Sequence, residues 1–192
     1  LEGGHGWLIK TLNAVGAQEV FKAISMSMVN KRPGDQQRVK LSVFAFTADH
    51  PAVFEPLLTI ATESKGSVCV YADGKCSTDG NTPMQWPQLH QLSKCRRATV
   101  YLAKGNGCRE HYEATEVTAQ GRGVYKGPGV HHRKALVLGP YKLSGSCSWT
   151  VSSLGNQEED HFLWMHQAGI DFVEELEATT YERSMPLARA QM

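Results

Sequence analysis

Two histidines and two cations stand together at His131-His132-Arg133-Lys134, directly before the apolar run Ala135-Leu136-Val137-Leu138. A Gly-Pro turn follows at 139–140, and a second short run leads into Gly145-Ser146-Cys147-Ser148-Trp149-Thr150. Two short runs joined by a turn predict a β-hairpin. An imidazole can attack phosphorus, and cations and hydroxyls can bind phosphate oxygens. The hairpin therefore carries groups that could hold and attack a phosphate, although residue types alone equally fit a surface hairpin with a basic tip.

The spacing within this segment suggests a role for each side chain. His132 and Lys134 are two residues apart, and side chains two apart on a strand share a face. We predict that His132 is a nucleophile that carries a covalent phosphoryl group, and that Lys134 stabilises charge on the non-bridging oxygens. Ser146 and Ser148 are predicted to donate hydrogen bonds to the same oxygens. This chemistry requires no metal ion and no cofactor.

The segment resembles the HxK(x)4D…GSxN signature of the phospholipase D superfamily. It is most similar to the small single-motif branch, which includes bacterial endonuclease-type members and the mitochondrial cardiolipin hydrolase/Zucchini type. In this resemblance His132-Arg133-Lys134 match HxK, and residues 145–150 match G-S-x-N-W-T with Ser148 in place of Asn. Gly139 stands where the motif has Asp, and the spacing from Lys134 to Gly145 is one residue short.

A second alignment of the same motif needs no gap. It makes His131-His132-Arg133 the HxK element, with Arg133 in place of Lys and Leu138 in place of Asp. We favour the register with His132 and Lys134 because it keeps the lysine, and we leave the other one open.

The resemblance implies a phosphodiesterase whose substrate is a phospholipid such as cardiolipin or a single-stranded nucleic acid. A histidine nucleophile needs its second nitrogen held by an acceptor, which fixes the tautomer. In the family a glutamate shortly after GSxN does this, and Glu158 or Glu159 matches by position. One HxK motif is half of a site, so the resemblance also implies a homodimer that completes the site across a two-fold axis.

Departures from the motif support a second hypothesis. The Asp is missing, Ser148 replaces Asn, and the hairpin is shortened. These changes favour a catalytically inactive member that serves as a structural or binding subunit and has other protein subunits as partners. A third hypothesis is an unrelated α/β protein with an accidental motif.

The residues before the hairpin predict an α/β fold. Residues 39–46 alternate as in a strand, Asp49 and Pro51 suit the start of a helix that runs to about Ser64, and residues 67–73 form a buried strand. This βαβ unit also resembles the first half of the phospholipase D fold. We therefore expect a phospholipase D-like mixed sheet flanked by helices on both faces.

Weaker patterns describe the remaining chain. We predict a helix over 7–29 with a break near Gly16, a short helix over 86–92, and strands over 98–102 and 160–165. Residues 104–129 suggest a long loop or irregular hairpin that leads into His131. An acidic helix is expected over 170–183, with four buried side chains: Ile170, Val173, Leu176 and Tyr181.

We divide the chain into three parts. Residues 1–36 are predicted to be an N-terminal helical segment and linker, residues 37–185 the phospholipase D-like domain, and residues 186–192 a C-terminal tail. The first residue is Leu1 rather than Met, which we interpret as removal of a targeting segment or as a trimmed sequence.

Composition is that of a soluble globular protein, with 41% hydrophobic and 20% charged residues. The net charge of +1 is unevenly distributed, because ten Lys/Arg and three Glu lie between Lys94 and Lys142, whereas eight acids and no Lys/Arg lie between Glu158 and Glu182. A basic middle suits an anionic partner, but also a solvated basic face. Five cysteines without a C-x-x-C pair suggest an intracellular, reducing compartment. The resemblance suggests the mitochondrion as one such compartment.

Overall fold

The structure is a computed structural model that describes ten stretches of the chain and four isolated positions. These are residues 5–13, 40–45, 50–63, 66–74, 85–103, 131–138, 141–155, 157–165, 167–182 and 184–187, together with 19, 22, 23 and 26. Only the backbone is described for residues 5–13, 40–42, 44, 45, 52, 85, 86, 154, 155, 157–160, 162–164, 168 and 185. The long loop predicted over 104–129 lies outside the described residues.

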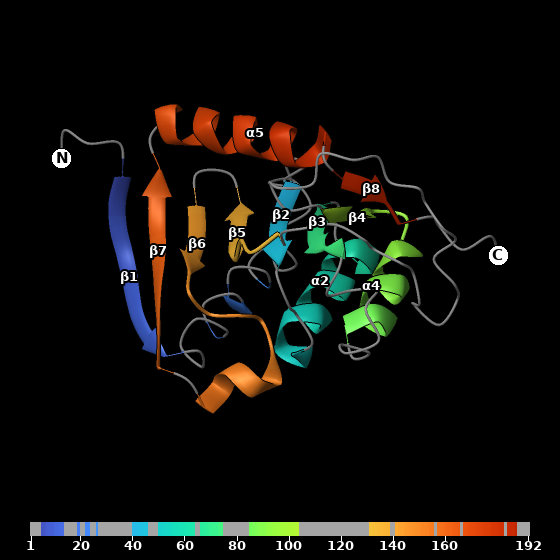
Figure 1. Cartoon of the computed structure of the whole chain (residues 1–192), viewed down its shortest axis with the longest axis horizontal. Helices are drawn as coiled ribbons and strands as arrows, with labels where there is room; N and C mark the ends of the chain where they lie inside the picture. Colours follow the sequence, from blue (N-terminus) through green and yellow to red (C-terminus); the bar gives the residue numbers. More distant parts are fainter. Residues whose placement is uncertain are drawn as a thin grey trace.

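A single eight-stranded sheet organises the described chain, in the order β1-β7-β6-β5-β2-β3-β4-β8 (Figure 1). The strands are β1 (His5–Asn13), β2 (Lys40–Ala45), β3 (Ser67–Asp73), β4 (Ala98–Ala103), β5 (Ala135–Leu138), β6 (Tyr141–Gly145), β7 (Gln157–Met165) and β8 (Ser184–Pro186). The neighbours β2, β3 and β4 are parallel, and all other pairs are antiparallel. The mixed sheet and the α/β class predicted from the sequence are confirmed.

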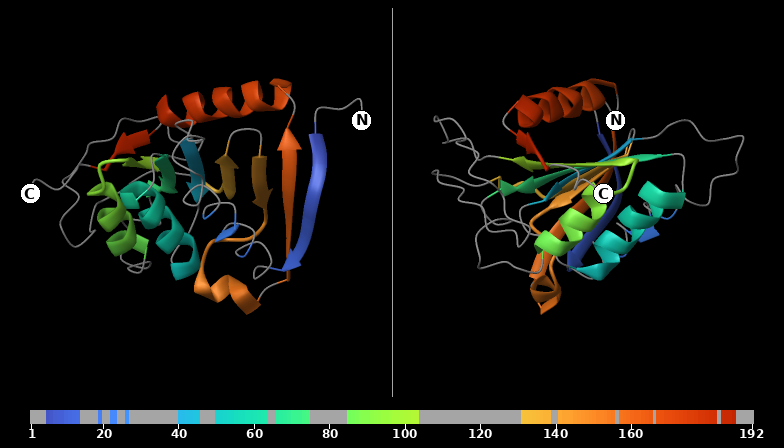
Figure 2. Two further views of the ribbon diagram at one scale, coloured as in Figure 1. Left: turned by 180° about the vertical axis from the view of Figure 1, so that it is seen from behind. Right: turned by 90° about the vertical axis from the view of Figure 1, so that its right-hand side faces the viewer.

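Two hydrophobic clusters lie on opposite sides of the central strands. The larger one joins Val68 and Val70 of β3 to helices α2 (Pro51–Glu63) and α4 (Gln85–Ser93). The smaller one takes the alternate residues Cys69 and Tyr71 together with Val173 of helix α5 (Gln167–Glu182). This alternation follows the two-residue period of a strand. Figure 2 shows α5 on the side of the sheet away from α2 and α4.

The prediction of a helix beginning at residue 7 is wrong. Residues His5–Asn13 form strand β1, which pairs antiparallel with β7 at the edge of the sheet. Trp7, Leu8 and Ile9 are consecutive apolar residues that suit a strand as well as a helix, and pairing with β7 decides between the two. The described positions 19, 22, 23 and 26 are helical. The division of the chain at residue 37 stays a prediction, although β1 belongs to the same sheet as the later strands.

The other predicted elements are present, with shifted ends. The strands at 67–73 and 98–102 appear as β3 and β4, the helices near 51–64 and 86–92 as α2 and α4, and the last helix as α5. Strand β7 begins at Gln157, three residues before the predicted start. Val173 is buried as expected, but the expected burial of Tyr181 is wrong because 55% of that side chain is exposed.

Two short elements were not predicted. A 3-10 helix, η1, covers Val151–Gly155, and β8 pairs with the edge of β4. Directly after β8, the backbone N–H of Leu187 donates a hydrogen bond of 2.8 Å to the carbonyl of Val100. The start of the predicted C-terminal tail is therefore held against the sheet.

Candidate phosphodiester site

The predicted β-hairpin is present and fills the centre of the sheet. Strands β5 and β6 pair antiparallel, with Ala135 opposite Ser144 and Leu138 opposite Tyr141. Strand β5 also pairs with β2, where Ala135 lies opposite Phe44. The segment 131–134 therefore lies just beyond the end of β2, at the edge where the parallel strands finish. Figure 1 shows β2 ending and β5 beginning at the lower edge of the sheet.

Residues 131–134 precede strand β5 and do not belong to it. The two-residue period of a strand therefore does not place His132 and Lys134 on one face, as the sequence analysis predicted. The ladder with β2 begins at Ala135. Ahead of it, the backbone N–H of His131 donates to the carboxylate of Asp73, the last residue of β3. A buried carboxylate thus replaces a ladder partner at this point, because a buried backbone N–H needs an acceptor.

His132 and Lys134 are nevertheless in contact. The ammonium Nζ of Lys134 lies 3.2 Å from Nδ1 and 3.3 Å from Nε2 of the His132 ring. The same ammonium donates to the backbone carbonyl of His132 at 3.0 Å. His132 is exposed, whereas only 7% of Lys134 is exposed. An accessible imidazole with a fixed cation behind it is the arrangement that nucleophilic attack on a phosphate would use.

His131 occupies a different environment from its neighbour. Its side chain is 5% exposed, and burial lowers the pKa of its imidazole to about 4. The nearby charges of Arg133, Lys134 and His132 lower this pKa further. The ring is therefore neutral near pH 7 and is enclosed by protein.

Arg133, the second member of the ungapped register, reaches toward α5. Its Nη1 donates to the hydroxyl of Thr180 at 2.8 Å, and Thr180 is buried. Lys142 of β6 is near enough to feel this charge: burial, followed by repulsion from Arg133, lowers the pKa of the Lys142 ammonium. The cations of the hairpin thus separate into two groups, with Lys134 beside the exposed imidazole and Arg133 held by α5.

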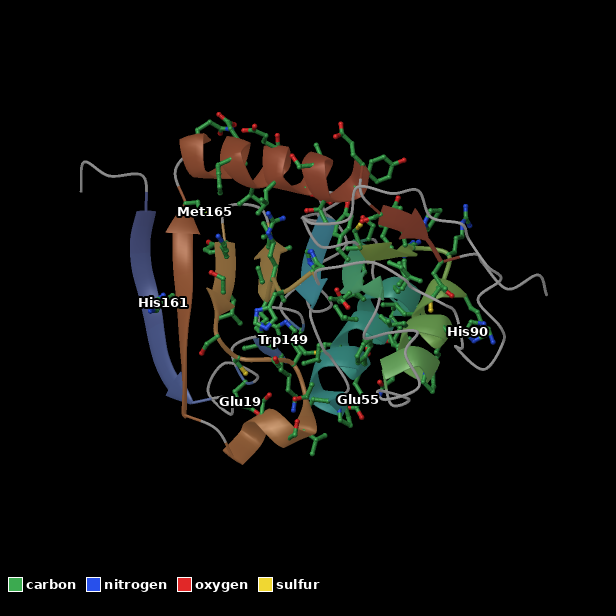
Figure 3. The ribbon with its side chains drawn as sticks, viewed as in Figure 1. Glu19, Glu55, His90, Trp149, His161 and Met165 are labelled. Carbon is green, nitrogen blue, oxygen red and sulfur yellow. The ribbon has the colours of Figure 1, made fainter. Side chains whose placement is uncertain are left out.

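The segment after β6 alternates between solvent and core. Ser146 is exposed and Ser148 is half-buried, whereas Cys147 and Trp149 are fully buried in the larger hydrophobic cluster. The carbonyl of Trp149 accepts a 3.1 Å hydrogen bond from the backbone N–H of His50, directly before α2. Figure 3 shows Trp149 among the side chains below the hairpin. Trp149 therefore belongs to the hydrophobic core below the hairpin.

Glu158 is placed only as a position on β7. Asp160 of this strand lies opposite Gly145, so the first residues of β7 run beside the segment that carries Ser146. The Glu158 and Glu159 side chains lie outside the described part of the structure, and the role of Glu158 stays a prediction. The roles assigned to His132, Lys134, Ser146 and Ser148 also stay predictions.

Two contacts at this site were not anticipated. Strand β3 ends in Asp73, but no local pattern indicates that this carboxylate holds the backbone of His131. The Arg133–Thr180 contact joins residues far apart in the chain and leaves no local sequence signal. Among the described residues, no three His, Cys, Asp or Glu side chains are grouped so that they could hold a metal ion.

Several solved structures share this architecture. NucT from Helicobacter pylori is 13% identical, with a TM-score of 0.63 over 93% of this chain and 99% of its own. The phospholipase D family member Nuc from Salmonella typhimurium is 10% identical, with a TM-score of 0.59 over 86% and 90%. This fold is therefore shared with a phospholipase D family member.

A larger protein shows the same likeness in part of its length. Phosphatidylserine synthase from Haemophilus influenzae is 12% identical, with a TM-score of 0.58 over 93% of this chain and 39% of its own. Neither protein-family models nor curated protein sequences give a match to this chain. The likeness thus concerns the arrangement of the backbone, on which the segment 131–150 supplies the side chains described above.

Proposed function

We propose that the chain is a phospholipase D-type phosphodiesterase. One observation carries the proposal: an exposed imidazole, His132, lies 3.2 Å from the ammonium of Lys134 at the edge of a phospholipase D-like sheet. The fold supports phosphodiester chemistry in general.

The proposed reaction has two steps. A ring nitrogen of His132 attacks phosphorus, and the P–O bond to the leaving alcohol breaks as that alcohol takes a proton from a general acid. Water then attacks the phosphohistidine and gives a proton to the group that served as general acid, the P–N bond breaks, and both the imidazole and the acid are restored. Lys134 and the hydroxyls of Ser146 and Ser148 would stabilise the phosphoryl oxygens, at roughly 100- to 1000-fold in rate per preorganised donor. Glu158 would hold the second nitrogen of His132.

The general acid is proposed to come from a second copy of the chain. Each chain supplies one exposed imidazole, that of His132, in the segment 131–134, and a two-fold axis would bring two such rings together. We propose a homodimer, located in a reducing intracellular compartment such as the mitochondrion. The substrate class is a phospholipid such as cardiolipin or a single-stranded nucleic acid. None of the described helices is long and apolar enough to cross a membrane.

An inactive, binding role is the second candidate, and one observation favours it. The motif aspartate would fall on Gly139 or, in the ungapped register, on Leu138, which is a buried member of the larger hydrophobic cluster. Neither register therefore supplies a carboxylate at this position of β5. Such a chain would keep its fold and bind other protein subunits, but it would not hydrolyse a substrate.

Hydrolysis assays separate these candidates. The purified chain is tested on bis(p-nitrophenyl) phosphate, a single-stranded oligonucleotide and cardiolipin vesicles, beside His132→Ala, His131→Ala and His90→Ala. His90 is a half-buried residue of α4 and serves as the matched histidine control. We expect turnover by the wild type, its loss in His132→Ala, and its retention in His90→Ala. Activity that disappears in folded His131→Ala and survives in His132→Ala would support the ungapped register instead.

Trapping the intermediate tests the mechanism itself. A phosphohistidine contains a P–N bond, so a rapidly quenched reaction should leave an acid-labile, alkali-stable phosphoryl group on the peptide that contains His132. Light scattering should give a mass twice that of the chain. A folded dimer that hydrolyses none of the three substrates would favour the binding role.

A further inference from the structure

A cleft lies between residues 174–181 of α5 and the strands β3 and β4. Its volume is about 590 Å³, and its walls come from β3, β4 and α5. Tyr71 and Tyr101 form the sheet side, and Glu174, Glu177 and Tyr181 form the helix side. This volume falls within the range of about 300–1,000 Å³ that is usual for small-ligand pockets. The described residues that line it include none of those proposed for phosphodiester chemistry.

Three aromatic rings line the cleft in a fixed arrangement. Tyr71 and Tyr101 lie opposite each other on neighbouring strands, with ring centroids 5.2 Å apart and planes within 13° of parallel. Tyr181 of α5 meets Tyr101 edge to face, with centroids 5.3 Å apart and planes at 84°. Tyr71 is buried, Tyr101 is partly buried, and Tyr181 is largely exposed. The aromatic wall therefore extends from the interior to solvent, which gives a planar cation ring faces to stack on.

The charge of the cleft is negative. Among the described residues that line it, two are carboxylates, Glu174 and Glu177, and none is Lys or Arg. These two glutamates are three residues apart on α5, so they lie on the same face of the helix. Glu174 is exposed and Glu177 is half-buried. A positively charged ligand would meet one carboxylate at the mouth and the other deeper in the cleft.

Glu177 is held in position by the aromatic wall. The hydroxyl of Tyr71 donates to Oε1 of Glu177 at 3.0 Å. Burial, followed by interactions with Cys69 and Glu177, raises the pKa of Tyr71 far above its usual value, so the phenol keeps its proton. A carboxylate can accept about four hydrogen bonds, so this contact leaves it able to accept further ones. The carboxylate is thus oriented by a permanent donor beside stacked rings.

We propose that this cleft binds an alkylguanidinium group. A guanidinium is planar, stacks on aromatic faces and donates through a rigid fork that matches a carboxylate. The stacked tyrosines, the fixed Glu177 and the outer Glu174 supply complementary partners for each of these properties. The inference does not depend on the proposed hydrolytic activity.

Calorimetry with a matched pair of probes tests the charge. Butylguanidinium and butylurea have nearly the same size and planar head, but only the first is charged. We expect saturable butylguanidinium binding with a Kd of about 1 mM or below, and at least about tenfold weaker binding of butylurea. The affinity should fall as salt is added, because the attraction is electrostatic. Equal affinities for the two probes, or no butylguanidinium binding at about 20 mM, would overturn the proposal.

Variants of α5 locate the bound cation. Glu177→Gln and Tyr181→Leu should each weaken butylguanidinium binding about five- to tenfold, because one removes a charge and the other a ring face. Glu175→Gln is the matched control, since Glu175 is an exposed glutamate of the same helix that does not line the cleft. It should change the affinity by less than about twofold. A loss in Glu175→Gln as large as that in Glu177→Gln would show a diffuse effect of charge and would refute the site. Tyr181 is largely exposed, so its variant provides the test if Glu177→Gln does not fold.

Two further probes distinguish the sources of the guanidinium. The first is a small free compound, 4-guanidinobutanol, and the second is a capped Gly-Arg-Gly peptide. Tighter binding of the peptide identifies a polypeptide arginine as the natural occupant, and tighter binding of the free compound identifies a metabolite-sized ligand. Either result supports the guanidinium site, whereas failure of both to compete with butylguanidinium would argue against it.

Discussion

His131 should make the stability of the protein depend on pH in a way that one substitution removes. The imidazole is 5% exposed, and its pKa in the folded chain is about 4, compared with 6.5 for an unperturbed histidine. Burial is the largest cause, followed by repulsion from Arg133, Lys134 and His132. The unfolded chain therefore binds a proton more readily than the folded chain, and acidification favours unfolding.

The size of this effect follows from the two pKa values. At pH values above the pKa of the unfolded chain, His131 is neutral in both the folded and the unfolded state, so it contributes no pH dependence. Below it, linkage predicts a loss of about 1.4 kcal/mol at about pH 5.5 and about 2.5 kcal/mol at about pH 4.5. The loss of stability approaches about 3 kcal/mol once the pH falls below the pKa of His131 in the folded chain. That is a large part of the stability of an ordinary domain, which is about 5–15 kcal/mol.

Urea unfolding of the wild type and His131→Gln measures this contribution. Many carboxylates also titrate over the same range, so stability is measured for both proteins at about pH 7.5, 5.5 and 4.5, and the variants are compared at each pH. The difference between the two curves of unfolding free energy against pH cancels the contributions of the titrating groups that both proteins share. The wild type should lose about 1.4 kcal/mol more than His131→Gln by about pH 5.5. Histidine proton shifts followed by NMR should show the His131 ring neutral until about pH 4.

Parallel curves for the two proteins would refute the reasoning. A second outcome would be more informative. If the Asp73 carboxylate stabilised a charged ring, the folded pKa would be raised, and the wild type would gain stability relative to His131→Gln on acidification. The sign of the difference therefore decides whether burial or the nearby carboxylate controls His131.

Substitutions at three positions test local contacts and packing by urea unfolding. Asp73→Ala should cost about 2–3 kcal/mol because it leaves the buried N–H of His131 without this acceptor, and Asp73→Asn should cost less because an amide oxygen can still accept; equal costs would contradict the assigned contact. Tyr71→Phe should cost about 1–2 kcal/mol through loss of the 3.0 Å hydrogen bond to Glu177, and the absence of this cost in a Glu177→Ala background, which lacks the acceptor, would confirm the pairing. Trp149→Ala should cost about 3–5 kcal/mol because the ring is fully buried, and a cost below about 1 kcal/mol would argue against its place in the core.

The central part of the fold could be predicted from local sequence. Strand β3 is almost wholly buried, and its apolar run ends at Asp73, so both its type and its end are visible in the residues. The same holds for α2, which begins at Pro51, where proline suits the first turn of a helix. These elements carry their own boundary signals.

The edges of the sheet could not be predicted in this way. Residues 5–13 form strand β1 because they pair with β7. Their apolar residues, such as Trp7 and Ile9, fit the helical repeat as well as the strand repeat. Tyr181 occupies a helix position that the apolar pattern assigns to the core, yet it lines an open cleft. In both cases the outcome depends on tertiary neighbours that the local pattern does not contain.

The candidate site shows the same limit at the scale of one residue. The run from Ala135 to Leu138 is apolar on both faces, so hydrophobicity alone cannot decide which way it faces, and a slip of one residue would exchange the surroundings of His131 and His132. The partner strand removes this freedom. In β6 only Leu143 is fully buried, between the half-buried Lys142 and Ser144, and it lies opposite Leu136.

That pairing directs Leu136 into the larger hydrophobic cluster, where Leu143 also lies. Because side chains alternate along a strand, the direction of the preceding residue, Ala135, is then fixed as well. Asp73 anchors the N–H of His131 just ahead of this point, which leaves His132 exposed beside Lys134. The sequence motif names two histidines, but a single leucine on the neighbouring strand and an aspartate on β3 determine which of them meets solvent. The choice of catalytic histidine in the proposed mechanism is therefore a consequence of strand register, which is why alignment of the motif alone left it open.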